Sequence, residues 1–186
     1  MNRTKRKIFE IAMKLFSEKG YDATSIEEIT ATVGVAKGTL YYHFNSKEEI
    51  FNFLVEEGMK LLKNSIEIKT SKCDTTKDKL KAIILIQIKG IVKYENMLSI
   101  IFSQLYGNEA KNKLCQDKVQ EYIDVIEKII SEGIEKNEMK ECNPKLMAYT
   151  IFSLTSSIMM YKKQTGKEYS ITELYRECEK LIFDNK

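Results

Sequence analysis

The sequence has little of the residues that hydrolytic enzymes and metal sites use most. It contains one histidine, His43, and four cysteines that form no C-x-x-C pair: Cys73, Cys115, Cys142 and Cys178. Catalytic triads and zinc sites usually draw on histidine or on closely spaced cysteines. Neither the phosphate-binding motif G-x-x-x-x-G-K-[ST] nor the dinucleotide-binding motif G-x-G-x-x-G occurs in the sequence. We therefore predict no metal site, no disulfide framework, no cofactor and no enzymatic activity.

Long hydrophobic runs are also missing. The longest uncharged run, Leu146 to Tyr161, is broken by serines and threonines and is shorter than the roughly 20 apolar residues that a membrane-spanning helix needs. The basic amino terminus is not followed by a signal-peptide core, because Glu10 and Lys14 interrupt the apolar residues there. We expect a cytoplasmic protein with no membrane partner.

The charges are nearly balanced. Thirty basic residues face 27 acidic ones, which gives a net charge of +3 and an isoelectric point near 8.5. This balance does not fit a chain that binds nucleic acid over its whole surface. Any nucleic-acid surface must therefore be local.

Helix is the element that the sequence favours almost everywhere. One proline, eight glycines and many helix-forming residues accompany apolar residues at helical spacing, so we predict an all-α fold. The first helix should end at Lys19-Gly20. The second should begin after Thr24 and Ser25, which both offer cap hydroxyls, with Glu27 and Glu28 as capping-box partners.

Further helices follow from the same signals. The second helix should stop at Gly34, a third should span Ala36 to Phe44, and Ser46 with Glu49 should cap a long fourth one. A polar loop covers 71–77, and the remaining helices are predicted at 80–92, 97–106, 111–136, 144–163 and 170–183. The result is a small amino-terminal domain, residues 1–48, joined to a larger helical bundle, residues 49–186.

Two short helices around Gly34 indicate a function. A glycine turn between helices, with Ile29, Val35 and Leu40 as the buried set, is typical of a helix-turn-helix, whose second helix enters the major groove of DNA. That second helix needs only Leu40 and Phe44 for its core. It leaves the following residues outward: Lys37, Gly38, Thr39, Tyr41, Tyr42 and His43.

The segment Val35 to Phe51, VAKGTLYYHFNSKEEIF, resembles the TetR family of bacterial transcriptional regulators. The resemblance extends over residues 1–55 and includes the Leu15-Phe16 end of the first helix. Beyond residue 60 only the helical layout and the length match. The resemblance implies a DNA-binding amino-terminal domain and a carboxy-terminal domain that responds to a ligand.

The resemblance also implies roles for individual residues. Lys37 would donate to guanine or phosphate, and Gly38 would let the backbone approach DNA closely. Thr39 would hydrogen-bond a base edge or a phosphate, and Tyr41 would contact a base or a thymine methyl group. Phosphate contacts are expected from these residues: Thr24, Ser25, Tyr42, His43 and Lys47. Ala36 stands where the family often has a capping serine.

Structural interpretations compete with these roles. Tyr41 and Tyr42 can cover the joint with the long helix, and His43 can be an ordinary packed or surface residue. Lys47 can be a solvated first-turn lysine, and the basic segment Arg3–Lys7 can be a disordered arm rather than a groove reader.

The carboxy-terminal bundle predicts a second subunit. The run Leu146 to Tyr161 has more apolar surface than one core-facing stripe needs. The last helix carries a further stripe: Ile171, Leu174, Tyr175, Cys178, Leu181 and Ile182. Two such helices from each of two chains would form a four-helix homodimer interface. The alternative is an ordinary helix pair in a monomer.

A pocket for a small hydrophobic or aromatic effector is the last prediction. Candidate lining residues are Met59, Leu62, Gln87, Phe102, Tyr106, Tyr122, Tyr149, Phe152 and Met159. The same residues can also be plain core. We predict a homodimeric, sequence-specific repressor that a ligand releases from a pseudo-palindromic operator. The alternative function is a protein-interaction adaptor that has kept the helix-turn-helix without operator binding.

Overall fold

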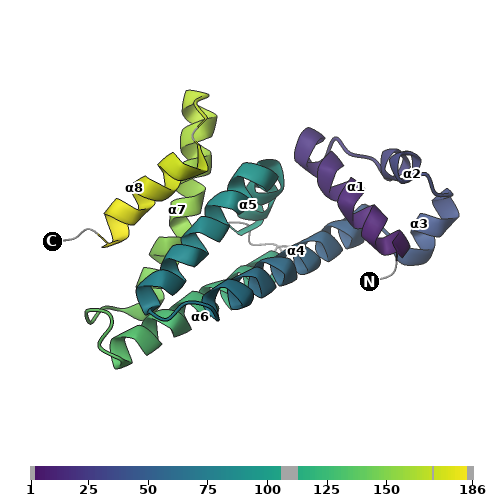
Figure 1. Ribbon diagram of the computed structural model, residues 1–186. Coiled ribbons are helices and arrows are strands. Elements are labelled where there is room, and N and C mark those ends of the chain that lie inside the picture. Colours follow the sequence, from purple (N-terminus) through teal and green to yellow (C-terminus); the bar gives the residue numbers. More distant parts are fainter. Residues whose placement is uncertain (1–2, 106–112, 169, 184–186) are drawn as a thin grey trace. The chain divides into compact units, whose positions relative to one another are not determined.

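A computed structural model describes residues 3–105, 113–168 and 170–183, and these residues form helices and loops without a strand, as Figure 1 shows. The all-α prediction is confirmed. The helices in the described ranges are α1 (Arg3–Lys19), α2 (Ile26–Val33), α3 (Lys37–His43), α4 (Lys47–Thr70), α5 (Thr76–Leu105), α6 (Lys113–Glu135), α7 (Pro144–Thr165) and α8 (Ile171–Phe183).

Local signals set most helix ends where the sequence predicts them. Gly20 and Gly34 have φ of 88° and 73°, the left-handed conformation that glycine adopts without a Cβ penalty. The Ser25 hydroxyl accepts a hydrogen bond from the Glu28 amide at 3.0 Å. Asn143 caps α7 in the same way, ahead of Pro144.

Three local predictions are wrong. α5 continues through the predicted gap between 92 and 97, with one non-helical residue, Tyr94 (φ −130°, ψ 30°), as a kink. Residues 3–7 belong to α1 and are not a disordered arm. The carboxylates of Glu27 and Glu28 do not complete a capping box, because ion pairs with Lys37 and Lys19 occupy them.

The chain forms two compact units. Unit 1 consists of Met1–Met59 and Tyr94–Gln116, and unit 2 consists of Lys60–Lys93 and Asp117–Lys186. α4 and α5 each begin in one unit and end in the other. The sequence predicts a boundary at residue 48 between the DNA-binding domain and the larger helical domain. This boundary divides the chain by function, and it stays a prediction.

Unit 1 has an aromatic core beneath α1, α2 and α3. The ring of Tyr21 lies 5.3 Å from the rings of both Phe16 and Phe51, measured between centroids. α3 and its carboxy-terminal cap contribute only Leu40 and Phe44 to this core, as the sequence predicts. The rest of α3 is therefore available for other contacts.

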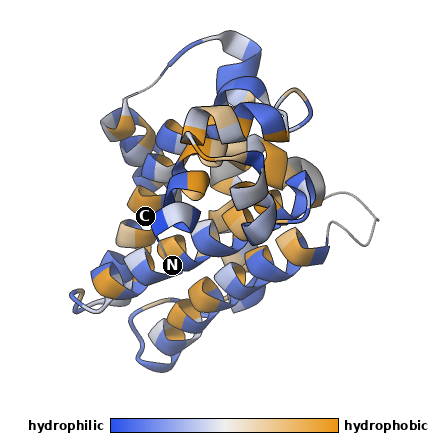
Figure 2. Cartoon of the chain, turned by 90° about the vertical axis from the view of Figure 1, so that its right-hand side faces the viewer, coloured by the Kyte–Doolittle hydropathy of each residue, from blue (hydrophilic) through white to orange (hydrophobic). Residues whose placement is uncertain are grey.

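Hydrophobic and hydrophilic segments alternate along the helices of the chain, as the orange and blue colours of Figure 2 show. Apolar residues form the interior of unit 2. Its buried residues include Leu80, Ile83, Ile126, Ile130 and Ile151. The Glu138 carboxylate accepts a hydrogen bond from the Thr76 amide at 2.5 Å and so caps α5. None of the helices in the described ranges has the length and hydropathy needed to span a bilayer.

Candidate nucleic-acid interface

The recognition helix α3 presents most of its residues to solvent. Lys37, Gly38, Thr39 and Tyr41 are exposed, and Tyr42 is 84% exposed. Large aromatic side chains are usually more buried than this. Covering the joint with α4 therefore does not account for Tyr42. The exposed set is the one predicted from the sequence except for His43, which is half-buried.

Two smaller features of α3 fit an external partner. A Cβ built on Gly38 would meet no atom within 4 Å, so packing within the protein does not require a glycine there. Ala36 caps the helix without a side-chain hydrogen bond, as its residue type predicts. His43 is half-buried, and its ring lies 5.0 Å from the ring of Tyr42.

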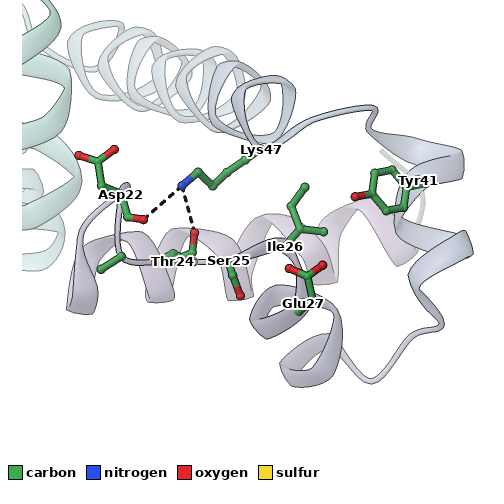
Figure 3. A pocket seen from close by; sticks show the side chains of 8 residues that line it. Asp22, Thr24, Ser25, Ile26, Glu27, Tyr41 and Lys47 are labelled. Atoms are coloured by element: carbon green, nitrogen blue, oxygen red, sulfur yellow. Dashed lines mark hydrogen bonds between the residues drawn. The ribbon is translucent and has the colours of Figure 1, made fainter.

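An open groove of about 340 Å³ lies in unit 1 beside α3. Residues 22–27, Tyr41 and Lys47 line it, as Figure 3 shows. It brings together side chains from α3, from the start of α4 and from the turn that precedes α2. The first amides of a helix lack intrahelical partners and favour an anion. Four predicted contact residues line one groove together with the Glu27 carboxylate: Thr24, Ser25, Tyr41 and Lys47.

Lys47 is already engaged in this groove. Its Nζ donates to the carbonyls of Tyr21 (3.0 Å), Thr24 (3.2 Å) and Asp22 (3.4 Å) and lies 4.4 Å from the centre of the Tyr21 ring. Figure 3 shows two of these bonds. An ammonium has three donors, so Lys47 clamps the α1–α2 turn to the start of α4. The interpretation as a solvated lysine is wrong, and a phosphate would have to compete with three carbonyls.

Thr24 also differs from its predicted role. Its side chain is 1% exposed, and its hydroxyl donates to the Gly20 carbonyl at 2.8 Å. Ser25 alone caps α2. The expectation of a Thr24 cap is wrong, and a hydroxyl contact from Thr24 to DNA does not fit this buried position.

Lys37 carries an acidic partner that the sequence analysis missed. Its Nζ lies 2.6 Å from Oε1 of Glu27 on α2 and 5.9 Å from the centre of the Tyr41 ring. The hydrogen bond to Lys37 lowers the pKa of Glu27, and the same bond raises the pKa of Lys37. Both groups are therefore charged at neutral pH. Ten residues separate them, a spacing at which no single-helix rule pairs side chains.

The predicted effector residues divide between the units. Met59 and Phe102 belong to unit 1, whereas Leu62, Gln87, Tyr122, Tyr149, Phe152 and Met159 belong to unit 2. Tyr106 lies outside the described residues. Tyr149 is exposed and donates its hydroxyl to the Gln120 side chain at 2.6 Å. It therefore does not line the interior of unit 2, contrary to the prediction.

Gln87 and Tyr122 are the buried polar members of that set. Among the described residues, neither polar atom of the Gln87 amide nor the Tyr122 hydroxyl has a hydrogen-bond partner of good geometry. The amide is close enough to counteract part of the rise that burial causes in the pKa of Tyr122. Buried polar groups are nearly always paired, so this pair calls for a third polar group. The Phe152 ring lies 6.0 Å from that of Tyr122.

Metal-binding chemistry has no visible support in the described part of the chain, where no group of three histidine, cysteine or acidic side chains comes together. Cys115 and Cys178 are buried, and burial raises the pKa of both thiols, that of Cys115 to about 11. Neither is activated as a nucleophile.

Known proteins resemble the chain in both parts. The family profile described as bacterial regulatory proteins, tetR family, matches residues 8–54, and the profile of the tetracyclin repressor-like C-terminal domain matches residues 73–184. A Bacillus subtilis protein, the fatty acid metabolism regulator protein, is 26% identical over 94% of this chain and 91% of its own. The biofilm operon negative transcriptional regulator IcaR of Staphylococcus epidermidis is 50% identical over 28% of each chain.

Solved structures agree over nearly the whole length. A Clostridium perfringens regulator assigned to fatty acid metabolism is 33% identical over 97% of this chain and 98% of its own, with a TM-score of 0.85. The FadR regulator of Bacillus subtilis in complex with stearoyl-CoA has the same fold, with 23% identity over 97% and 99% of the two chains and a TM-score of 0.85. The matched profiles, the exposed recognition helix and the glycine turn before it agree: the chain belongs to the tetR family of bacterial regulatory proteins and is a helix-turn-helix transcriptional regulator.

Proposed function

We propose that this regulator is a repressor that acts as a homodimer on a pseudo-palindromic operator. The homodimer leaves the operator when a long-chain acyl-CoA binds in unit 2. The observation that carries the DNA-binding part is the exposure of α3 around a single core residue, Leu40. A recognition helix must keep its base-reading side chains free of the core. Lys37, Thr39, Tyr41 and Tyr42 meet that condition.

The apolar surface of α7 supports the homodimer. Leu146 is 66% exposed and Met160 is 58% exposed, and Tyr149 and Tyr161 are also exposed. Grouped apolar exposure marks an interaction surface more often than isolated residues do. In α8 Cys178 of the predicted stripe is buried, and Ile171, Leu174 and Tyr175 are half-buried; the side chains of Leu181 and Ile182 lie outside the described set. A two-fold axis would give the dimer two recognition helices for two half-sites.

The acyl-CoA class rests on the relatives and on Gln87 and Tyr122. Two relatives are named as fatty acid metabolism regulators, and one solved relative holds stearoyl-CoA. The buried amide and phenol of this chain are uncharged, since burial raises the pKa of Tyr122. An uncharged acceptor such as a thioester carbonyl can accept hydrogen bonds from the Tyr122 hydroxyl and from Gln87 Nε2, whereas a carboxylate would be buried without a cation. The sequence predicts a hydrophobic or aromatic effector, and the proposal limits this range to long-chain acyl thioesters.

Operator release tests the proposal. An operator selected by the protein from random duplex DNA should bind two protomers, and stearoyl-CoA should weaken that binding. S-octadecyl-CoA, a thioether that lacks the carbonyl, should be at least about tenfold less effective, because it leaves buried polar groups unpaired. Free stearate should also be at least about tenfold less effective, because its carboxylate would be buried without a cation.

Two variants test whether residues of unit 2 distinguish the thioester from the thioether. Tyr122→Phe should reduce the advantage of the thioester over the thioether, whereas Tyr149→Phe, on an exposed tyrosine, should keep it. Stearoyl-CoA that leaves operator binding unchanged would contradict the effector class. Equal, weak binding to every duplex sequence would instead favour the adaptor.

A further inference from the structure

The ion pair between Lys37 and Glu27 sets the charge of the recognition helix. Lys37 is the one lysine or arginine of α3, and its Nζ lies 2.6 Å from the Glu27 carboxylate. Both side chains are more than half exposed, so the pair contributes little to folding stability. Its consequence lies in what Lys37 can bind.

We propose that Glu27 is a specificity-determining residue, which pairs with Lys37 so that this lysine accepts a base edge more readily than a phosphate. This inference rests on the proposed contact between Lys37 and operator DNA. It adds a residue that no motif of the sequence analysis identified as a DNA contact.

The physical difference between the two acceptors is their charge. A lysine ammonium has three donors and can bond Glu27 and a neutral guanine O6 or N7 at the same time. A phosphate brings a second full negative charge beside the carboxylate, and close like charges repel. Phosphate contacts supply most of the affinity for random DNA. Glu27 therefore weakens random binding more than operator binding.

The position of Glu27 strengthens this effect. Glu27 also lines the groove with Ser25, Tyr41 and Lys47, as Figure 3 shows. A phosphate held there would meet the same carboxylate. The pKa of Glu27 is lowered by its bond to Lys37, so the carboxylate stays ionised at neutral pH and keeps its effect.

Glu27→Gln and a matched control test the proposal. Glu28→Gln removes the same charge from the next residue of α2, where the partner is Lys19 and not Lys37. Binding is measured to an operator selected by the wild-type protein and to a random duplex of equal length, over a salt series. The thermal midpoint of each variant confirms that it is folded.

Glu27→Gln should tighten random-duplex binding about fivefold per protomer at 0.15 M salt and steepen the salt dependence by about 0.9, the effect of one added phosphate contact. Operator affinity should change by less than about twofold, because in the operator complex Lys37 contacts a neutral base edge, which the Glu27 carboxylate does not repel. Glu28→Gln should leave the ratio of the two affinities near the wild-type value. In a Lys37→Gln background, Glu27→Gln should lose its separate effect.

Several results would overturn the inference. Equal changes in the ratio of the two affinities from Glu27→Gln and Glu28→Gln would mean that Glu27 acts only through its contribution to the net charge. A selective loss of operator affinity would mean that Glu27 itself reads a base, such as the cytosine amino group. If Glu27→Gln still tightened random-duplex binding in the Lys37→Gln background, the ion pair with Lys37 would not be the cause. Failure of the wild-type protein to select any duplex would contradict the proposed DNA binding instead.

Discussion

The two units present their functional groups in opposite ways. In unit 1 the candidate DNA contacts are exposed, as Lys37 and Tyr42 are, and the core beneath them is apolar. In unit 2 the polar groups of interest, Gln87 and Tyr122, are buried without a hydrogen-bond partner of good geometry among the described residues, and the exposed residues of α7 include large apolar ones. A surface that meets a charged polymer needs exposed donors. A site for an apolar ligand needs a few polar groups inside.

The largest expected effect is on the free energy of unfolding, and it distinguishes a buried residue of α3 from an exposed one. Leu40→Ala should lower the free energy of unfolding by about 2–5 kcal/mol, because Leu40 is fully buried. Tyr42→Ala should change it by no more than about 0.5 kcal/mol and should weaken operator binding. Urea denaturation and DNA titration measure the two effects. Equal stability losses would contradict the division of roles within the helix.

In unit 2, tight packing between α6 and α5 is the next test. A Cβ at Gly133 would lie 2.5 Å from Cγ2 of Thr76, so Gly133→Ala should destabilise the protein by about 1–3 kcal/mol. Gly90→Ala is the control, since no atom lies within 4 Å of a Cβ there. It should stabilise the helix by about 0.5–1 kcal/mol. Thermal unfolding of both variants gives the comparison, and a gain in stability at Gly133 would refute the close contact.

Lys47 tests whether every basic residue near the groove serves DNA. Lys47→Ala removes three carbonyl contacts and should cost about 1–2 kcal/mol, a value reduced because the side chain is only half-buried. We expect the salt dependence of random-duplex binding to stay unchanged, since the ammonium is engaged within the protein. A slope lower by about 0.9 per protomer would show that Lys47 exchanges its carbonyls for a phosphate.

The smallest effect concerns the unpaired phenol. Tyr122→Phe should stabilise the ligand-free protein by about 1 kcal/mol, because it removes a buried hydroxyl that has no partner of good geometry in the described part of the chain. The ligand-bound protein should gain less, since the hydroxyl is then paired. Thermal unfolding with and without stearoyl-CoA measures both. A destabilised ligand-free variant would mean that a buried water already satisfies this hydroxyl.

The sequence predicts features that depend on neighbouring residues. The glycine turns at Gly20 and Gly34 and the serine caps follow from local backbone chemistry, and they are where the sequence places them. The exposed set of α3 follows from the small core that this helix needs. These local rules account for the helix-turn-helix and for most helix ends.

Features that depend on distant contacts were not predictable in this way. Lys47 finds its carbonyls 23 to 26 residues away, and Glu27 finds Lys37 on another helix. The Tyr94 kink has no proline or glycine at its position to signal it. The burial of Gln87 and Tyr122 in one interior is a property of the folded chain, which no residue pattern reveals.

The shared helices α4 and α5 limit how the protein can be recombined. The chain passes between the units at residues 59–60, 93–94 and 116–117, so neither unit is a single stretch of sequence. A chimaera that exchanges only residues 1–59 would separate the DNA-reading surface from Tyr94–Gln116, which completes its unit. Modular exchange in this protein therefore requires two grafted segments, with junctions inside α4 and α6 and at the Tyr94 kink of α5.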